Sequence, residues 1–261
     1  MWAHEQTITD CIEMLKSADV RTAAAREKRR GRAITVPMFN HGVSDAYHAF
    51  GTRSESVDAV AHEHGMRIIR VQQVHGTDIL VINRLKDAAS FETGYDAMVT
   101  DQPGALITVK TADCVPILFL DPVRRVVAAA HAGWRGSLGG IAIKTVEVMR
   151  QRFRCDFRSI RVAIGPSIGR CCYEVDEPVL NPLKRVFPYW QDMVHKARGG
   201  RGQLDLRGLN RRQLEDAGIA PQQIEIVNLC TACHDDLFFS YRRDGIGTKH
   251  MISGIGFTTT S

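Results

Sequence analysis

The chain has 261 residues, of which 44% are hydrophobic and 24% are charged, as in an ordinary globular protein with a buried core. The formal net charge is +5, but the excess is spread along the sequence. Its densest run, residues 26–32, contains no aromatic side chain, so we expect a solvated segment and no nucleic-acid partner.

The seven cysteines are an odd number and include the adjacent pair Cys171-Cys172, which suits no small disulfide framework. We therefore expect reduced thiols in a cytoplasmic protein. Residues 1–6 lack the basic and apolar regions of a signal peptide, and the sequence has no apolar run of about 18 residues. The sequence thus predicts no membrane span.

The predicted elements begin with an amphipathic helix within residues 7–30, which leads into the basic run. We interpret residues 1–32 as a helical, basic N-terminal extension and residues 33–261 as the main domain. A second helix is predicted over residues 54–65, because Gly65 is a suitable helix end.

Beyond Gly65 the hydrophobic pattern changes from helical to strand-like. Two strands are predicted on either side of a turn at 75–78, and three later apolar runs have the character of buried strands. In chain order the five ranges are 66–74, 79–83, 105–109, 117–120 and 126–130.

A glycine-rich stretch at 133–140 leads into a predicted helix at 141–153. A strand follows at 160–164, residues 176–220 are expected to be mostly helix and loop, and another strand is predicted at 224–229. Strands and helices mix without strict alternation and no linker divides them. We therefore predict one α+β domain with mixed sheets, and not a doubly wound α/β fold.

Three reactive side chains lie at the ends of predicted strands: His75, Cys114 and His131. Such positions are rigidly held and reach a cleft. Two imidazoles and one thiolate are good zinc ligands, and three protein ligands leave a fourth position for water or substrate. The intervals of 39 and 17 residues are too long for a zinc finger, so this pattern favours a catalytic site assembled by the fold.

Spacing alone leaves other interpretations open. A histidine after a strand is commonly a hydrogen-bonded core or turn residue, and a buried cysteine commonly packs as a small hydrophobic residue. Cys114 could also be a nucleophile activated by His131, as in a thiol amidase or acyl hydrolase.

The motifs around these residues resemble the signature of the YfiH-like family, also known as the laccase-domain or polyphenol oxidase family. Supporting stretches at 163–175, 204–210 and 239–244 follow in the expected order. The three motifs are Gln73-Val74-His75-Gly76, Thr111-Ala112-Asp113-Cys114-Val115-Pro116 and His131-Ala132-Gly133-Trp134-Arg135-Gly136.

This resemblance implies a layered α/β sandwich of the cysteine hydrolase type found in cytotoxic necrotising factor. It implies a catalytic domain at 33–261 in which His75, Cys114 and His131 are the metal ligands and Zn²⁺ is the cofactor. The implied activity is that of a purine nucleoside phosphorylase acting on adenosine, inosine, guanosine or methylthioadenosine with phosphate. Hydrolytic deamination of adenosine is implied as a second reaction.

Two alternative functions accompany the resemblance. Related bacterial proteins are called peptidoglycan editing factors, which fits a cysteine hydrolase using Cys114 and His131 on peptidoglycan precursors. The older family name suggests a copper polyphenol oxidase, or laccase. That reading fits poorly, because multicopper centres need many histidines and this chain has ten scattered ones.

Two further residues are candidates for the site. Arg53 ends a family-like segment, His48-Ala49-Phe50-Gly51-Thr52-Arg53, and is the candidate for phosphate contact, since a guanidinium grips phosphate with two bonds; a surface ion pair is the alternative. The glycine-rich loop that usually follows in the family is missing here, which alters the expected pocket rim. Asp113 is expected either to orient a histidine or transfer a proton, or to cap a turn.

The segment Cys230-Thr231-Ala232-Cys233-His234 spells the attachment pattern of c-type haem. The sequence gives no secretion signal to support haem, and the pair lacks a matching cysteine pair at zinc-knuckle spacing. For the adjacent Cys171 and Cys172 the sequence favours buried packing.

Overall fold

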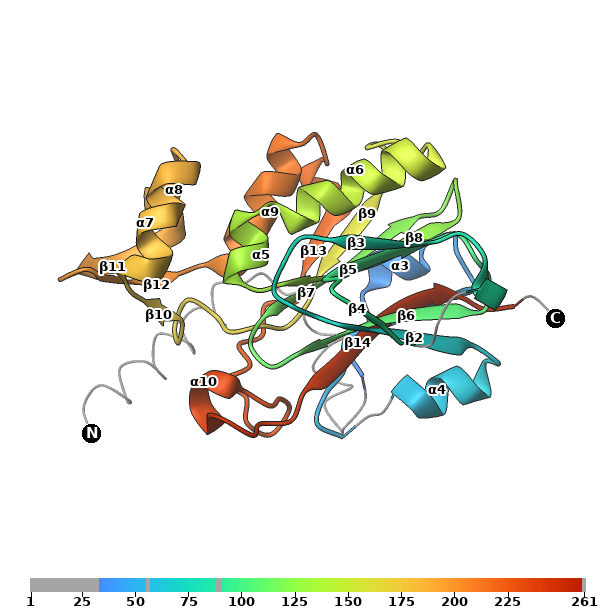
Figure 1. The fold of residues 1–261 in the computed structure, drawn as a ribbon, viewed down its shortest axis with the longest axis horizontal. Coiled ribbons are helices and arrows are strands. Elements are labelled where there is room, and N and C mark those ends of the chain that lie inside the picture. Colours follow the sequence, from blue (N-terminus) through green and yellow to red (C-terminus); the bar gives the residue numbers. More distant parts are fainter. Residues whose placement is uncertain (1–32, 55–56, 88–90, 260–261) are drawn as a thin grey trace.

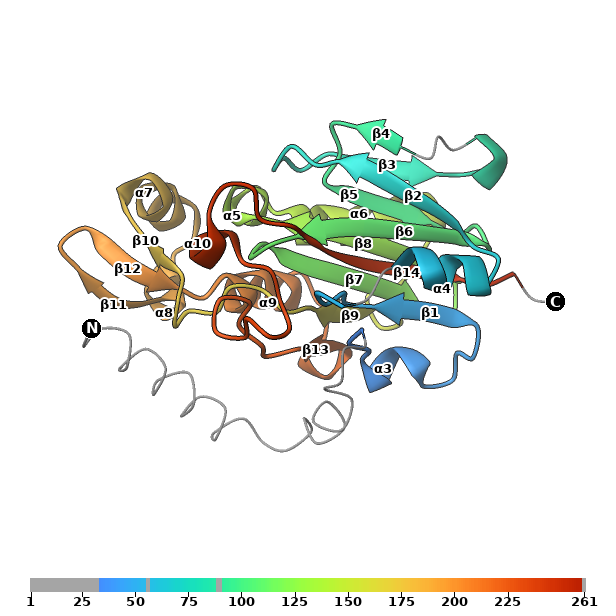
Figure 2. The same cartoon turned by 90° about the horizontal axis from the view of Figure 1, so that it is seen from below.

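The computed structural model describes residues 33–54, 57–87 and 91–259; the extension predicted at 1–32, with its helix, lies outside the described residues. Two β-sheets stack face to face in the described part, and helices cover their outer faces (Figure 1 and Figure 2). The prediction of one layered α+β domain with mixed sheets is confirmed.

The larger sheet has six strands in the order β13-β9-β7-β8-β5-β3. The pairs at its two edges are parallel and the central pairs are antiparallel. Its strands are β3 (Ile79–Ile82), β5 (Ala97–Thr100), β7 (Val115–Asp121), β8 (Val126–Ala132), β9 (Arg161–Ile164) and β13 (Ile224–Ile226).

The two central strands of this sheet, β7 and β8, are buried along their whole length. Successive side chains point to opposite faces, so Ile117 and Phe119 of β7 pack under the covering helices while Leu118 and Leu120 pack between the two sheets. A strand buried on both faces needs an unbroken apolar run, and the sequence shows such runs here.

The second sheet has five strands in the order β1-β14-β6-β2-β4. Its C-terminal strand β14 lies between β1 and β6 and pairs antiparallel with both. The strands are β1 (Ala46–Ala49), β2 (Arg67–Gln72), β4 (Phe91–Thr93), β6 (Ala105–Thr111) and β14 (Met251–Phe257).

Glycine allows the close packing of β14, a strand that the sequence analysis did not predict. A Cβ atom at Gly256 would lie only 2.0 Å from the Ala105 carbonyl oxygen, so no larger residue fits there. The glycines of Gly254-Ile255-Gly256 also interrupt the apolar alternation on which strand prediction depends.

On the outer face of the six-stranded sheet lie α5, α6 and α9, and α4 packs on the other sheet (Figure 1). The helix observed at 141–153 has the predicted bounds, and its buried face follows helical spacing. The helices outside the small third sheet are α3 (Pro37–Asn40), α4 (Val57–Glu63), α5 (Trp134–Leu138), α6 (Ile141–Phe153), α9 (Leu206–Asp216) and α10 (Tyr241–Asp244), with the 3-10 turns η1 (Leu85–Asp87) and η2 (Pro221–Gln223).

A third, small sheet projects from one end of the sandwich, where Figure 1 shows it beside α7 and α8. The expectation of mostly helix and loop at 176–220 is wrong for its hairpin. Gly199 and Gly200 both have positive φ angles, of 57° and 77°, as a two-residue hairpin turn requires. The elements here are β10 (Glu174–Val175), α7 (Glu177–Val186), α8 (Trp190–Met193), β11 (Val194–Arg198) and β12 (Arg201–Leu204).

Among the described residues, no helix combines the length and the apolar character that crossing a bilayer requires.

Candidate metal centre

The pairing of β5, β7 and β8 brings together residues that are distant in the sequence. Pro116 of β7 lies opposite His131 of β8, so Cys114, just before β7, lies beside the end of β8. On the other side of β8, the backbone N–H of His131 donates a 2.7 Å hydrogen bond to the carbonyl of Asp96, the residue before β5. The sheet register therefore fixes the separation of a thiol, an imidazole and a carboxylate.

His75 lies in the turn between β2 and β3, where its φ angle of 62° is unusual for a residue other than glycine. The Asp96 carboxylate holds this turn by accepting three backbone N–H groups, from Val74 at 3.1 Å, His75 at 3.0 Å and Gly76 at 2.7 Å. A turn whose amides converge on one carboxylate has little freedom, so Asp96 sets the position of the His75 ring.

The structure brings His75, Cys114 and His131 together, with one ligand atom of each within 4.8 Å of the others. The two imidazole rings meet edge to face, with their centroids 4.9 Å apart. His131 is buried, Cys114 is partly exposed and His75 is exposed, so solvent reaches the group from the His75 side.

Asp96 also binds the side chain of His131, whose Nδ1 lies 2.8 Å from the Asp96 Oδ1 atom. Nδ1 is thereby engaged, which leaves Nε2 as the atom free to act toward Cys114 or an ion. Burial alone lowers the pKa of His131, but its hydrogen bonds to Asp96 and Cys114 outweigh burial and raise that pKa to about 9. A carboxylate behind a histidine is the usual support of a metal-binding imidazole.

The Cys114 thiol is more acidic than an ordinary cysteine thiol. Burial raises its pKa, but hydrogen bonds to His131 and His75 outweigh burial and lower the pKa to about 7. The metal ligand and the nucleophile are both the thiolate, so the two imidazoles favour the reactive form of this sulfur.

Gly133 keeps space open beside the three side chains. A Cβ at this position would lie 3.2 Å from the Cys114 Sγ atom and 3.2 Å from Cδ2 of His75, tighter than ordinary contacts. A larger residue here would crowd the Cys114 and His75 side chains. The donor set of two nitrogens and one sulfur, the carboxylate behind His131 and this space all fit a zinc ion.

Asp113 ties the site to a distant loop. It has a φ angle of 96°, and its carboxylate accepts hydrogen bonds from the Thr231 hydroxyl at 2.5 Å, the Ser240 hydroxyl at 3.1 Å and the Arg242 backbone N–H at 2.6 Å. The sequence leaves open whether Asp113 orients a histidine, transfers a proton or caps a turn. The bond from the Arg242 N–H, in the first turn of α10, agrees with the last of these. The carboxylate that orients a histidine is that of Asp96.

The Arg53 guanidinium contacts the loop that bears Thr231 and Ser240, and not the three ligands. Its guanidinium donates to the Asp235 carbonyl and stacks on the Phe239 ring, with 4.6 Å from Cζ to the ring centroid. Phe239 directly precedes Ser240, the partner of Asp113, so this stacking places the Arg53 guanidinium against the loop that Asp113 holds.

Asp96 is the residue of the site that the sequence analysis missed. It stands in Gly94-Tyr95-Asp96-Ala97, just before a buried strand, and this position is the signal that could have found it. The four cysteines near 171 and 230 were also not grouped, because nothing in their spacing shows that the two segments meet.

The fold and the candidate centre define a layered α+β protein with a His-Cys-His ligand set. A family model described as multi-copper polyphenol oxidoreductase laccase matches residues 37–258. The chain belongs to this laccase-domain family, as the sequence motifs predicted.

Curated relatives in the family carry enzyme names. Purine nucleoside phosphorylase YlmD of Geobacillus stearothermophilus is 40% identical over 197 residues, which cover 73% of this chain and 72% of the relative. Adenosine deaminase RL5 of an unknown prokaryotic organism is 37% identical over 196 residues, covering 72% and 74%. The match to mouse purine nucleoside phosphorylase LACC1, at 36% identity, spans 77% of this chain but only 46% of that longer protein.

Solved structures show the same fold. The crystal structure of YlmD from Geobacillus stearothermophilus superposes with a TM-score of 0.77 at 30% identity, covering 89% of this chain and 98% of the other. The Bacillus licheniformis protein YfiH superposes with a TM-score of 0.75 at 30% identity, covering 82% and 93%.

Replacing Asp96 by Asn tests its role in the site. An amide cannot accept all the bonds that the carboxylate accepts, so we expect a loss of about 1.5–3 kcal/mol in the free energy of unfolding. Metal affinity should fall about 10- to 100-fold, as for other supports of metal-binding histidines. Denaturant unfolding and competition with a chelator measure the two effects. Asp78→Asn, at a neighbouring exposed carboxylate, is the matched control; equal behaviour of the two variants would refute the role.

The ionisation of Cys114 gives a second test. In the metal-free protein, alkylation of Cys114 should reach half its maximal rate near pH 7, because the thiolate reacts and its pKa is about 7. Asp96→Asn weakens the support of a protonated His131, so the midpoint should move to higher pH. Peptide mass spectrometry measures the alkylation of Cys114 separately from that of the other cysteines. A midpoint near the ordinary thiol value of 9.0 in the wild type would contradict the assignment.

Proposed function

We propose that this protein is a zinc-dependent purine nucleoside phosphorylase that also deaminates adenosine. The observation that supports the proposal most is the convergence of His75, Cys114 and His131 within 4.8 Å on a fold shared with phosphorylase relatives. The substrates would be purine nucleosides of the adenosine, inosine, guanosine and methylthioadenosine class, together with phosphate.

The three proposed ligands suit one divalent ion. When bound, zinc supplies a Lewis acid that polarises an oxygen or lowers the pKa of a water molecule to about 7. With three protein ligands one position stays available to water or substrate, as in catalytic zinc sites. A single site with one sulfur and two nitrogens also differs from the many-histidine set of a multicopper oxidase.

The protein side chains around the ion have separate tasks. Asp96 fixes the tautomer of His131 and the backbone at His75, and so orients two ligands before substrate arrives. Cys114 contributes the negative charge. Val74, an apolar residue that is 55% exposed next to His75, is proposed as a surface for the planar base.

Arg53 is proposed as the phosphate contact. Its guanidinium is held by the Asp235 carbonyl and the Phe239 ring, which fixes its direction against the loop that Asp113 ties to Cys114. A preoriented, permanently charged guanidinium suits a planar two-bond contact to phosphate oxygens.

A second candidate function rests on a specific observation. Cys114, His131 and Asp96 form a chain of thiol, imidazole and carboxylate like that of a cysteine hydrolase, and the Cys114 pKa of about 7 suits a nucleophile. This alternative, which includes a hydrolase of peptidoglycan precursors, does not need His75. The phosphorylase proposal gives His75 a task as the third ligand and agrees with the names of the relatives.

His75→Ala separates the two functions. The metal-dependent account predicts that zinc content at this site and phosphate-dependent release of adenine from adenosine both fall by at least 100-fold, since two ligands hold zinc poorly. Cys114→Ala should behave alike. Metal analysis and chromatographic assay of adenosine with phosphate measure this. The thiol hydrolase account predicts a different result. In that account His75→Ala stays active, whereas Cys114→Ala is inactive and alkylation of Cys114 abolishes turnover.

Arg53→Gln tests the phosphate contact. Removing the charged contact should raise the KM for phosphate about tenfold, which corresponds to roughly 1.4 kcal/mol of lost binding free energy. The zinc content should stay as in the wild type. Initial rates at varied phosphate measure the change. Deamination of adenosine uses no phosphate and serves as the internal control. An unchanged KM for phosphate would remove Arg53 from the site.

A further inference from the structure

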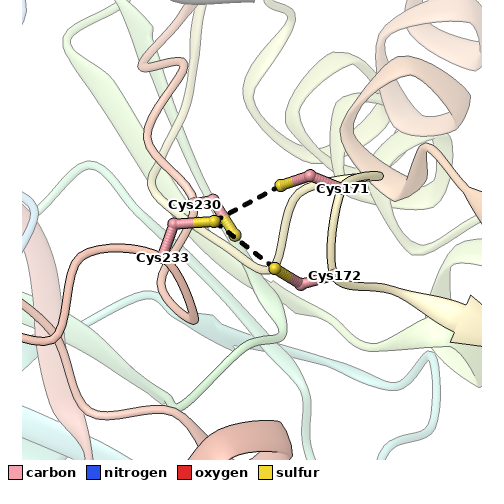
Figure 3. Close-up of side chains that lie close together, drawn as sticks. All are labelled: Cys171, Cys172, Cys230 and Cys233. Atoms are coloured by element: carbon pink, nitrogen blue, oxygen red, sulfur yellow. Dashed lines mark hydrogen bonds between the residues drawn. The ribbon is translucent and has the colours of Figure 1, made fainter. Parts of the chain in front are cut away.

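Four cysteine thiols meet in a second place, away from the sheet ends that carry the first three ligands. We call them the four-cysteine cluster. Figure 3 shows their sulfur atoms pointing toward one another from two loops, one at 165–173 and one at 229–234. All four sulfur atoms lie within 4.8 Å of one another; the members are Cys171, Cys172, Cys230 and Cys233.

The sulfur separations have the size that one bound ion requires. The Cys233 sulfur lies 3.6 Å from that of Cys171 and 3.4 Å from that of Cys172. A tetrahedron with zinc–sulfur bonds of about 2.3 Å has edges of about 3.8 Å. A disulfide would need about 2.0 Å between two sulfur atoms, so the thiols are not paired in this way.

Other sulfur-ligated groups fit less well. An iron–sulfur cluster holds several metal and sulfide atoms between its cysteines, which spreads the thiolates further apart than a single ion does. Haem attachment would require the Cys230 and Cys233 sulfurs to face outward, but they face the sulfurs of the other loop (Figure 3). Four thiolates around one point are typical of zinc.

The backbone arranges the loops before any ion binds. Ser167 pairs with Cys230 as an isolated parallel bridge, and the Thr231 N–H donates to the Ser167 carbonyl at 3.0 Å. The Gly169 N–H donates to the Cys230 sulfur at 3.2 Å, the kind of support that thiolate ligands receive from the backbone. A Cβ at Gly169 would lie 3.2 Å from the Cys171 sulfur, so glycine permits this approach.

The loops have little apolar packing of their own. The buried members of their small hydrophobic group are Ile168 and two of the cysteines themselves, with Tyr173 packed partly against them. Such a group excludes little water, so burial supplies only weak stabilisation. A bound ion is a known substitute for a missing core.

Positive charge surrounds the cluster. Zinc with four thiolates has a net charge of −2, which favours cationic neighbours. Guanidinium groups donate to the carbonyls of both loops: Arg242 to Cys172 at 3.2 Å, Arg243 to Thr231 at 3.1 Å, and Arg207 to Leu229 at 3.0 Å. The partly exposed Cys172 and Cys233 leave a path for an ion to enter.

We propose that the four-cysteine cluster binds one zinc ion as a closed structural site, separate from the candidate catalytic centre. This ion fastens the loop at 165–173 to the loop at 229–234. The second loop bears Thr231, whose hydroxyl donates to Asp113 beside Cys114, so the structural ion braces one wall of the catalytic centre.

Metal content tests the proposal directly. Protein purified under reducing conditions should contain two zinc ions per chain, and the double variant Cys230→Ser/Cys233→Ser should contain one. The double variant His75→Ala/Cys114→Ser should also retain one, held by the four-cysteine cluster. Cys155→Ser, at a buried cysteine outside both sites, is the matched control and should keep two.

A spectroscopic measurement tests the proposal without changing the four cysteines, and so does not depend on whether the serine variant folds. Cobalt(II) added to metal-free His75→Ala/Cys114→Ser protein, in which the cluster is intact, should give intense thiolate-to-cobalt absorption that saturates at one equivalent. The four thiols should then resist alkylation until a chelator is added. Saturation without thiolate absorption, or a disulfide among these cysteines in the mass spectrum, would overturn the proposal.

The outcome is independent of the proposed function. If wild-type protein fails to phosphorolyse any purine nucleoside but the His75→Ala/Cys114→Ser protein binds one cobalt through thiolates, the structural site stands and the activity does not. If phosphorolysis is found but that double variant contains no metal, the structural site is refuted alone.

Discussion

The Asp96 carboxylate is the contact on which the arrangement of the candidate centre depends. One oxygen meets Nδ1 of His131 at 2.8 Å, and together the two oxygens accept the three amides of the turn that carries His75. Burial raises the pKa of this carboxyl, but the hydrogen bonds from His131 and from Gly76 outweigh burial and lower it, so Asp96 stays ionised. One buried negative charge thus positions two imidazoles from different parts of the chain.

The strand pairing supplies the rest of the geometry. Cys114 owes its place to the antiparallel register of β7 and β8, which are buried on both faces and therefore cannot slip without exposing apolar side chains. Cys114 and His131 lie at the ends of these strands and His75 lies in the turn before β3, where the buried sheet meets solvent. On the other side, Thr231 and Ser240 donate hydrogen bonds to Asp113, the neighbour of Cys114. The loop that bears Thr231 therefore contacts both the proposed structural ion site and the candidate catalytic centre.

Much of this could be predicted from local patterns. The runs at 117–120 and 126–130 are buried strands because a doubly covered sheet demands apolar residues at every position, and the helix at 141–153 shows its period plainly. Contacts between distant segments could not be predicted in this way. Asp96 gives no sign in the sequence of which histidine it will meet, and the glycines of β14 hide a strand that depends on close packing. The two cysteine pairs meet because β9 pairs with β13 and Ser167 then bridges to Cys230, which no local pattern shows.

The central claim is that one ion is held by His75, Cys114 and His131. X-ray absorption at the zinc edge of the zinc-loaded Cys230→Ser/Cys233→Ser protein tests it most directly, because this variant keeps the candidate centre but lacks two ligands of the four-cysteine cluster. The account predicts one sulfur at about 2.3 Å and two imidazole nitrogens at about 2.0–2.1 Å, with the remaining position filled by a light atom. A spectrum without sulfur, or without imidazole nitrogen, would contradict the account.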